Sequence, residues 1–408
     1  MTTRHPLVVG LDIGTMKCAA VVAEVTETSV NVLGVGRQDS KGLRKGVIIN
    51  IETTVQSIKQ AVEQAELMSG CDIKNVYAGI SGGHIKSFNS HGMIALKEPE
   101  VGVKDLERVM EAAGAVAIPT DREVLHVLPS EYVVDEQRGV RHPVGMTGVR
   151  LEVNCHIITG STTNIGSSVK CCNDVGVVVE KMVFSPLASA LAVLSDEERE
   201  VGAVVLDIGG GTSDIAVFHE GALVHSAVLA LGGGHITNDI AHGLRIPAHP
   251  SAESLKKKYG SALASEADPH EDIPLQDVGF REERWVSRQI LCEIVEQRCD
   301  EILRLIRAEL AESGYMDVAQ SGLVITGGCA LLPQFDRLAE QVFGAPVRIG
   351  TPRGIVGHNE LVADPSFACA AGLTLFGARE TRSGKRSSGG PGLGKGWENF
   401  KSWIKDFF

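Results

Sequence analysis

Two short segments of the chain carry the residue types that proteins use to bind phosphate. Residues 10–15 (Gly-Leu-Asp-Ile-Gly-Thr) follow an apolar run and precede Lys17, and residues 207–213 (Asp-Ile-Gly-Gly-Gly-Thr-Ser) follow another apolar run. Glycine lets backbone N–H groups approach phosphate oxygens, hydroxyl groups add donors, and lysine adds positive charge. The predicted phosphate-binding residues are Gly14, Thr15, Lys17, Gly209, Gly210, Gly211, Thr212 and Ser213.

Asp12 and Asp207 occupy matching positions at the ends of the two apolar runs. Mg²⁺ prefers one or two carboxylates together with water molecules, so both residues are predicted to hold Mg²⁺ through water. A third apolar run ends in Thr326-Gly327-Gly328, a turn at which an adenine ring could approach the backbone. One such turn is common in β-hairpins, but the ordered set of three indicates a nucleotide-binding site.

The strands that must position these turns can be located from their apolar runs. Residues 7–13 and 19–25 predict a pair of strands around the first turn, and the same pattern returns between Val201 and Phe218. This repeat indicates an internal duplication of a strand–turn–strand unit. Further buried strands are predicted over 76–81 and 323–326.

Helices are predicted where apolar residues recur every three or four positions. They cover 53–68, with Thr53 or Thr54 as the cap, then 286–312 and 330–343. Between Gly82 and about Thr162 the pattern changes to short β segments. A helix near Lys104–Ala117 joins β patterns at Glu123–Leu128, Glu131–Val134 and Val149–Ile158, which indicates a small inserted α+β unit.

The composition excludes several classes of protein. The net charge is −12, which opposes general binding to a nucleic acid, because the polyanion would be repelled. The nine Cys include no C-x-x-C pair and the 13 His show no metal-ligand spacing, so a disulfide framework and a zinc site are not expected. No apolar run approaches the roughly 18 residues of a membrane span, and Asp12 interrupts the first run. We therefore expect a protein of the reducing cytosol.

The two phosphate turns and the Thr-Gly-Gly turn resemble those of the actin/Hsp70/sugar-kinase superfamily. Within it the chain is most similar to the FtsA family of bacterial cell-division proteins, over nearly its whole length. The resemblance implies an α/β, two-lobed actin-like (ribonuclease H-like) fold with a small inserted α+β subdomain and a C-terminal amphipathic helix on a flexible linker. The stretches that carry it are 10–22, 131–150, 185–194, 204–218, 231–241 and 322–350.

The resemblance also implies a division of the chain into parts. The core of the first lobe is expected from 1–82 and 163–195, with the inserted subdomain over 83–162. The second lobe is expected to have its core in 196–226 and 323–378 and a smaller subdomain in 227–322. A flexible linker is predicted over 379–396, followed by a helix over 397–408.

The resemblance implies that ATP, with Mg²⁺, binds between the two lobes. Glu253 and Lys256 match a ribose contact of the family, although a solvated ion pair on a helix surface is the alternative interpretation. Gly327 and Gly328 match the adenosine turn. Relatives that hydrolyse ATP place a Gln or Glu near the start of a helix that corresponds to 185–195, and this stretch contains neither. We therefore expect at most a weak ATPase, in which ATP is a structural or switching ligand.

The last twelve residues form one large aromatic face if they are helical. Basic residues outnumber acidic ones from Arg379 onward, which suits the surface of an anionic membrane. One copy should attach weakly and an array firmly. Docking on the body of the protein or in a partner's groove are the alternatives. The predicted membrane-binding residues are Trp397, Phe400, Lys401, Trp403, Ile404, Lys405, Phe407 and Phe408.

The resemblance finally implies a membrane adaptor in cell division. The chain would polymerise with ATP bound on the cytoplasmic face of the inner membrane, tether the FtsZ ring there and recruit later division proteins. Glu296, Arg298 and Glu301 match an E-x-R-x-x-E pattern on the FtsZ-binding surface, although such charges also occur on a plain surface helix. The alternatives are a soluble sugar-kinase-like enzyme and a pilus-assembly actin homologue, neither of which needs the aromatic tail.

Overall fold

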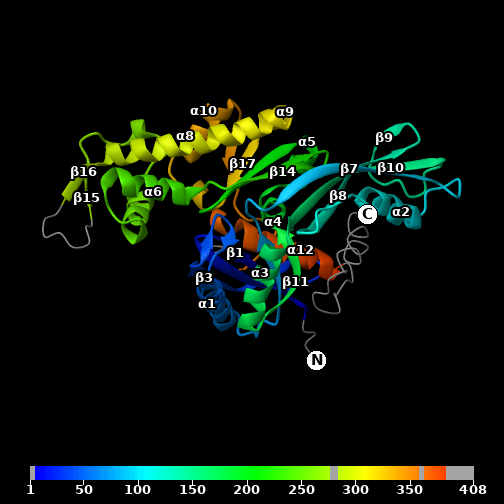
Figure 1. Ribbon diagram of the computed structural model, residues 1–408, viewed down its shortest axis with the longest axis horizontal. Helices are drawn as coiled ribbons and strands as arrows, with labels where there is room; N and C mark the ends of the chain where they lie inside the picture. Colours follow the sequence, from blue (N-terminus) through cyan, green and yellow to red (C-terminus); the bar gives the residue numbers. More distant parts are fainter. Residues whose placement is uncertain (1–4, 276–283, 358–362, 383–408) are drawn as a thin grey trace.

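The computed structural model describes residues 5–275, 284–357 and 363–382 (Figure 1). Its first sheet has the strand order β11-β6-β1-β2-β3. β1 is antiparallel to β2 and parallel to β6, so the sheet is mixed. The strands are β1 (Leu7–Ile13), β2 (Lys17–Val25), β3 (Val30–Asp39), β6 (Asn75–Ile80) and β11 (Val178–Phe184).

The second large sheet repeats the arrangement of the first. Its order is β14-β13-β12-β17-β18, with β12 antiparallel to β13 and parallel to β17. The internal duplication predicted from the sequence is therefore present in three dimensions. The strands are β12 (Ala203–Ile208), β13 (Ser213–His219), β14 (Ala222–Leu229), β17 (Leu323–Thr326) and β18 (Val347–Ile349). β14 crosses the boundary that was predicted after residue 226.

Two helices fill the space between these sheets (Figure 1). α4 (Ser185–Val193) packs on β12 and β13, and α12 (Ala368–Arg382) packs on α4, β1 and β2. The two helices lie very close together, since a Cβ on Gly372 would overlap the backbone of Ala188. The prediction that 323–378 belongs wholly to the second lobe is thus wrong, because the buried residues of α12 join the core of the first sheet.

Three further helices and a small hairpin complete this part of the chain. α1 (Ile51–Ser69) buries Ile58, Ala61 and Val62 against the first sheet. Its cap is Asn50, which accepts a hydrogen bond from the Thr53 N–H, and neither predicted threonine has this role. The other elements are α3 (Thr162–Val175), α5 (Asp196–Val201), β4 (Leu43–Arg44) and β5 (Val47–Ile48).

The inserted unit has its own sheet and its own core. The strand order is β7-β10-β8-β9, and α2 (Val103–Gly114) covers one face through Leu106, Val109 and Met110. The two short strands predicted between Glu123 and Val134 are one irregular strand, with a register shift beside Pro129. α2 ends three residues before the predicted Ala117. The strands are β7 (Lys86–Ala95), β8 (Arg122–Val134), β9 (Gln137–Val140) and β10 (Arg150–Ser161).

The remaining segment packs beside the second sheet around one long helix. α8 (Arg288–Glu312) begins two residues later than predicted, because Arg284–Ser287 pair with another strand as β16. The predicted helix over 330–343 is a 3₁₀ turn, Gly328–Leu331, and then α10 (Phe335–Phe343), since Pro333 lies between them. The other elements are α6 (Gly233–Leu244), a π-type turn (Ala248–Ala252), α7 (Glu253–Tyr259), two 3₁₀ turns (Ala264–Glu266 and Pro365–Phe367), β15 (Asp272–Leu275) and α9 (Met316–Ser321).

The end of α12 corrects the predicted start of the linker at residue 379. Glu380 lies 2.6 Å from Lys181, and Arg382 donates hydrogen bonds to the Thr26 and Ser29 carbonyls, so the helix continues to Arg382. Residues 383–408, which include every predicted membrane-binding residue, lie outside the described part of the chain. Among the helices that the structure describes, none is long and apolar enough to cross a membrane.

Candidate nucleotide-binding site

The two predicted phosphate turns have the same local geometry. Gly14 N donates to Lys17 O at 3.0 Å, and Gly209 N donates to Thr212 O at 2.9 Å. Each turn joins two antiparallel strands, so the backbone reverses directly after the strand that carries the aspartate. The backbone of each turn is therefore fixed by its own hairpin.

The structure brings these two turns into contact. A Cβ added to Gly211 would lie 2.5 Å from Thr15 Oγ1, and one added to Gly210 would overlap Met16. Thr15 is held in place, because its hydroxyl accepts a hydrogen bond from Gly46 N at 3.0 Å. Gly210 and Gly211 are thus required for the first turn to lie this close to the second.

Three carboxylates lie beside the turns, each with a different partner. Asp12 is 4.0 Å from the Lys17 ammonium, Ser189 donates to Asp207 at 2.5 Å, and Ser81 donates to Asp214. Burial raises the pKa of Asp12 above its usual range, and it raises the pKa of Asp207 to about 6. Burial also raises the pKa of Asp214 well above its usual range, and the neighbouring Asp207 adds to this shift.

Sequence reasoning missed three members of this group. Asp214 lies directly opposite Asp207 across the second hairpin, whereas the first hairpin has Ala19 opposite Asp12. The alternation of a strand could have indicated Asp214, because it follows the predicted turn immediately. No local pattern indicates Ser81 or Ser189, which come from other elements.

Lys17 is the cation of the site. Its ammonium donates to the Ser366 carbonyl and lies 4.4 Å from the centre of the Phe367 ring. Burial lowers the pKa of Lys17, and the negative charge of Asp12 opposes that shift. The turn before α12 therefore fixes the lysine of the first hairpin.

The charges of the site fit a nucleotide together with a divalent cation. In addition to burial, Asp12 raises the pKa values of Asp207 and Asp214, Asp207 raises that of Asp214, and Lys17 supplies one positive charge among them. A bare phosphate chain would be repelled by this arrangement, whereas Mg²⁺ would compensate the carboxylates. Across residues 5–275, 284–357 and 363–382 there is no cluster of three or more His, Cys, Asp or Glu suited to a metal ion.

The predicted adenosine turn supports the second hairpin. Gly327 has φ = +84°, and a Cβ there would overlap Asp207, so glycine is required. The Thr326 hydroxyl donates to the carbonyls of Gly350 and Pro365 and anchors the turn. A Cβ on Gly328 would meet nothing within 4 Å, which leaves its backbone accessible.

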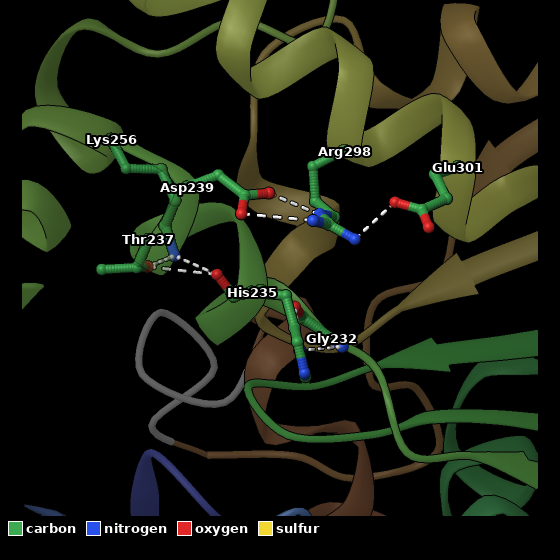
Figure 2. Close-up of polar contacts among 8 residues, drawn as sticks. Gly232, His235, Thr237, Asp239, Lys256, Arg298 and Glu301 are labelled. Carbon is green, nitrogen blue, oxygen red and sulfur yellow. Dashed lines mark hydrogen bonds and ion pairs between the residues drawn. The ribbon is translucent and has the colours of Figure 1, made fainter. Parts of the chain in front are cut away.

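Glu253 and Lys256 form a largely buried cluster with Thr237, and Figure 2 shows Lys256 reaching Thr237. Lys256 Nζ lies 2.7 Å from Glu253 and donates to Thr237 Oγ1 at 2.9 Å and to Gly233 O at 3.0 Å. The two side chains are only 13 % and 12 % exposed, so the alternative of a solvated pair is wrong. Burial acts to raise the pKa of Glu253, but Lys256 and the Thr237 hydroxyl lower it further. The net shift is downward and keeps the carboxylate ionised.

The start of α6 links this cluster to the second hairpin. Gly233 N donates to Gly209 O at 2.9 Å, and Gly234 N donates to Gly210 O at 2.8 Å. These two backbone bonds join the start of α6, where the Gly233 carbonyl accepts from Lys256, to two glycines predicted to bind phosphate.

The candidate FtsZ-binding residues divide into two groups. Arg298 on α8 donates to Asp239 on α6 and to Glu301, as Figure 2 shows. These three residues line an open groove of about 460 Å³ together with Gln297, Asp300, Arg304 and Leu305. Glu296 is not among the residues that line this groove. Its carboxylate instead accepts a hydrogen bond from Ala264 N at 2.7 Å.

Family models match two parts of the chain. Residues 204–372 match the family described as "Cell division protein FtsA", and residues 82–159 match "SHS2 domain inserted in FTSA". A cell division protein FtsA of Pseudomonas aeruginosa is 45 % identical over 383 residues, which cover 94 % of this chain and 92 % of the relative. The chain belongs to the FtsA family. The FtsA of Escherichia coli is 38 % identical over 100 % of this chain and 99 % of its own.

Solved structures show how the FtsA fold relates to other actin-like proteins. A PilM–PilN type IV pilus biogenesis complex aligns with a TM-score of 0.66 at 17 % identity, over 91 % of this chain and 98 % of that one. MreB5 of Spiroplasma citri, bound to ADP, aligns with a TM-score of 0.55 at 17 % identity, over 94 % and 98 %. These two structural alignments confirm the predicted actin-like fold. Because the chain belongs to the FtsA family, it has a role in cell division.

Proposed function

We propose that this chain is an ATP-binding, actin-like division protein that polymerises on the cytoplasmic face of the inner membrane. There it tethers the FtsZ ring and recruits later division proteins. Membership of the FtsA family supports the division role. The observation that carries the nucleotide part is the contact between two hairpin turns flanked by carboxylates and one lysine.

The nucleotide is proposed to lie with its phosphates against both turns. The backbone of Gly14 and of residues 209–211, the hydroxyls of Thr15, Thr212 and Ser213, and Lys17 would contact the phosphates. Asp12 and Asp207 would hold Mg²⁺ through water. Glu253 and Lys256 would face the ribose, and Gly327 and Gly328 the adenine.

The site is proposed to bind ATP and to hydrolyse it only slowly. α4 carries Ser185 and Ser189 but has no acid or amide to orient a water molecule. The Ser189 hydroxyl is already donated to Asp207. Without a general base, hydrolysis is expected to be slow, and the bound nucleotide would act as a switch between assembled and free states.

The partner surface is proposed to be the groove that contains Arg298 and Glu301. Arg298 is held between two carboxylates and is only 25 % exposed, so its guanidinium is positioned in advance. An acidic segment of FtsZ could take the place of Glu301. Arg298→Glu is expected to abolish co-sedimentation with FtsZ polymers, whereas Arg307→Glu on an exposed position of the same helix is the matched control.

Co-sedimentation with anionic liposomes tests the membrane part. The full chain is compared with a chain that ends at Gly396, with and without Mg-ATP. Trp403→Glu is expected to release the full chain from lipid, whereas Trp285→Glu, at a side chain 56 % exposed on β16, is expected to leave it bound. Equal pelleting of the full and shortened chains would refute the anchor.

A further inference from the structure

A partly enclosed apolar cavity lies where the inserted unit meets the two lobes. Its volume is about 260 Å³, and its walls come from β8, α4, α5, the β13–β14 hairpin and α12. A cavity of about 150 Å³ can take a benzene molecule, so this one has room for an aromatic ring and part of another. The apolar walls are Leu128, Leu187, Leu191, Phe218, Leu223 and Phe376.

The charged residues of the cavity carry an excess of available positive charge. Glu380 is paired with Lys181 at 2.6 Å, and Asp196 with Arg199 at 3.2 Å. Arg199 Nε is buried without a hydrogen-bond partner. Within the described residues no hydrogen bond or ion pair is found for Arg379. The cavity therefore suits an aromatic side chain with an acidic group nearby.

One segment of this chain has that chemistry and is tethered beside the cavity. Residues 397–408 contain two Trp, three Phe and the acids Glu398 and Asp406. α12 forms one wall of the cavity and ends at Arg382, three residues after Arg379. About 14 residues, rich in Gly and Ser, connect Arg382 to the segment, and a chain of that length spans about 21 Å. The effective concentration at the cavity would be in the millimolar range.

We propose that residues 397–408, when away from lipid, insert aromatic side chains into this cavity and place Glu398 or Asp406 near Arg199 and Arg379. The inference rests on the proposed membrane role of the segment. Docking covers an aromatic face that would otherwise be exposed to water. It excludes lipid binding by the same side chains, so the apparent lipid affinity is reduced by the docked fraction.

Photo-crosslinking in the full chain tests the docking directly. Trp403 is replaced by benzoylphenylalanine, the lipid-free protein is irradiated, and the products are mapped by mass spectrometry. Docking predicts intramolecular crosslinks to 185–199, 218–223 or 376–380, which anionic phospholipid vesicles suppress. Crosslinks elsewhere, or only between two copies, would overturn the proposal.

Two variants separate docking from loss of folding. Ala222→Phe fills the cavity, and Arg379→Glu reverses the charge of an exposed side chain without touching the core. Each is expected to reduce the crosslinks by at least about fivefold. Ala222→Phe, which leaves the charge unchanged, is also expected to raise the affinity for anionic vesicles about threefold to tenfold. Val201→Phe, at a position 71 % exposed outside the cavity, should change neither.

The two proposals fail in different ways. If Ala222→Phe and Arg379→Glu leave crosslinks and lipid affinity unchanged, the docking proposal is wrong and anchoring can still hold. If no variant pellets with vesicles while the crosslinks persist, membrane anchoring is wrong, and residues 397–408 dock in the cavity without binding lipid.

Discussion

The two phosphate hairpins are built alike but carry different chemistry. Both turns close with the same backbone hydrogen bond, yet Lys17 in the first corresponds to Thr212 in the second. Opposite the shared aspartate, the first hairpin has Ala19 and the second has Asp214. In the proposed nucleotide site the first hairpin would thus supply positive charge to phosphate, and the second would supply carboxylates and the glycines that allow contact.

Gly211→Ala is expected to have the largest effect, because it forces the two hairpins apart. The new Cβ would lie 2.5 Å from Thr15 Oγ1, and the short β-branched Thr15 cannot move aside. We expect nucleotide affinity to fall by about a hundredfold or more, measured by calorimetry with Mg-ATP. Gly166→Ala, in α3 with nothing near its Cβ, is the control and should bind normally. Unchanged affinity in Gly211→Ala would mean that the turns need not touch.

Lys17→Met removes the cation that distinguishes the first hairpin. A hydrogen bond to a charged group contributes about 1.5–3 kcal/mol, so affinity for Mg-ATP should fall about tenfold to a hundredfold. The pKa of Asp12 should also rise further, because Lys17 now opposes the effect of burial. Lys59→Met, at a side chain 53 % exposed on α1, is the matched control. A loss of less than about twofold for Lys17→Met would place the phosphates elsewhere.

The second hairpin should give the site its pH dependence. Burial raises the pKa of Asp207 to about 6, whereas an unfolded aspartate titrates near about 3.9. Between these values the folded state holds a proton that the unfolded state has lost, so this group lowers the free energy of unfolding as pH rises from about 4 to about 6. Asp207→Asn should flatten that part of the profile in denaturant titrations of the nucleotide-free chain.

Titration of Asp207 should also make the affinity for Mg-ATP depend on pH, and this affinity should rise with pH where the free energy of unfolding falls. Binding of Mg²⁺ near Asp207 requires the ionised form, so affinity for Mg-ATP should fall as pH drops below about 6. Asp207→Asn should bind more weakly at neutral pH and lack this step. Asp196→Asn, at a side chain 88 % exposed, should keep the wild-type profile. A parallel fall with pH in Asp207→Asn would assign the titration to another group.

Ser81→Ala should have the smallest effect. Ser81 reaches from the first lobe to Asp214 in the second at 2.7 Å, whereas the corresponding residue of the first hairpin is Ala19, which has no carboxylate to accept such a bond. Its loss should weaken nucleotide binding by about twofold to tenfold, in line with one hydrogen bond. Ser167→Ala, which removes a bond within α3, is the control. An effect as large as that of Lys17→Met would show that this bond holds the lobes together.

The sequence predicted those features that a local pattern specifies. The hairpins could be predicted because an apolar run, an aspartate and glycine stand next to one another, and α1 because its apolar spacing is regular. The position of α12 could not, since it depends on close contacts with distant segments, such as those of Gly372 with Ala188 and of Gly10 with Ala370. Ser81 and Ser189 were missed for the same reason, because contacts between distant segments leave no local signal.

Calorimetric titration of the full chain with ATP, in Mg²⁺ and then in excess EDTA, tests the central claim most directly. The account predicts one site per chain in Mg²⁺ and a loss of affinity of at least tenfold, roughly, without it, since three carboxylates face one lysine. It also predicts that Lys17→Met weakens the Mg²⁺-dependent binding. Binding of equal strength with and without Mg²⁺, or no binding in either, would contradict a nucleotide site built from the two hairpins.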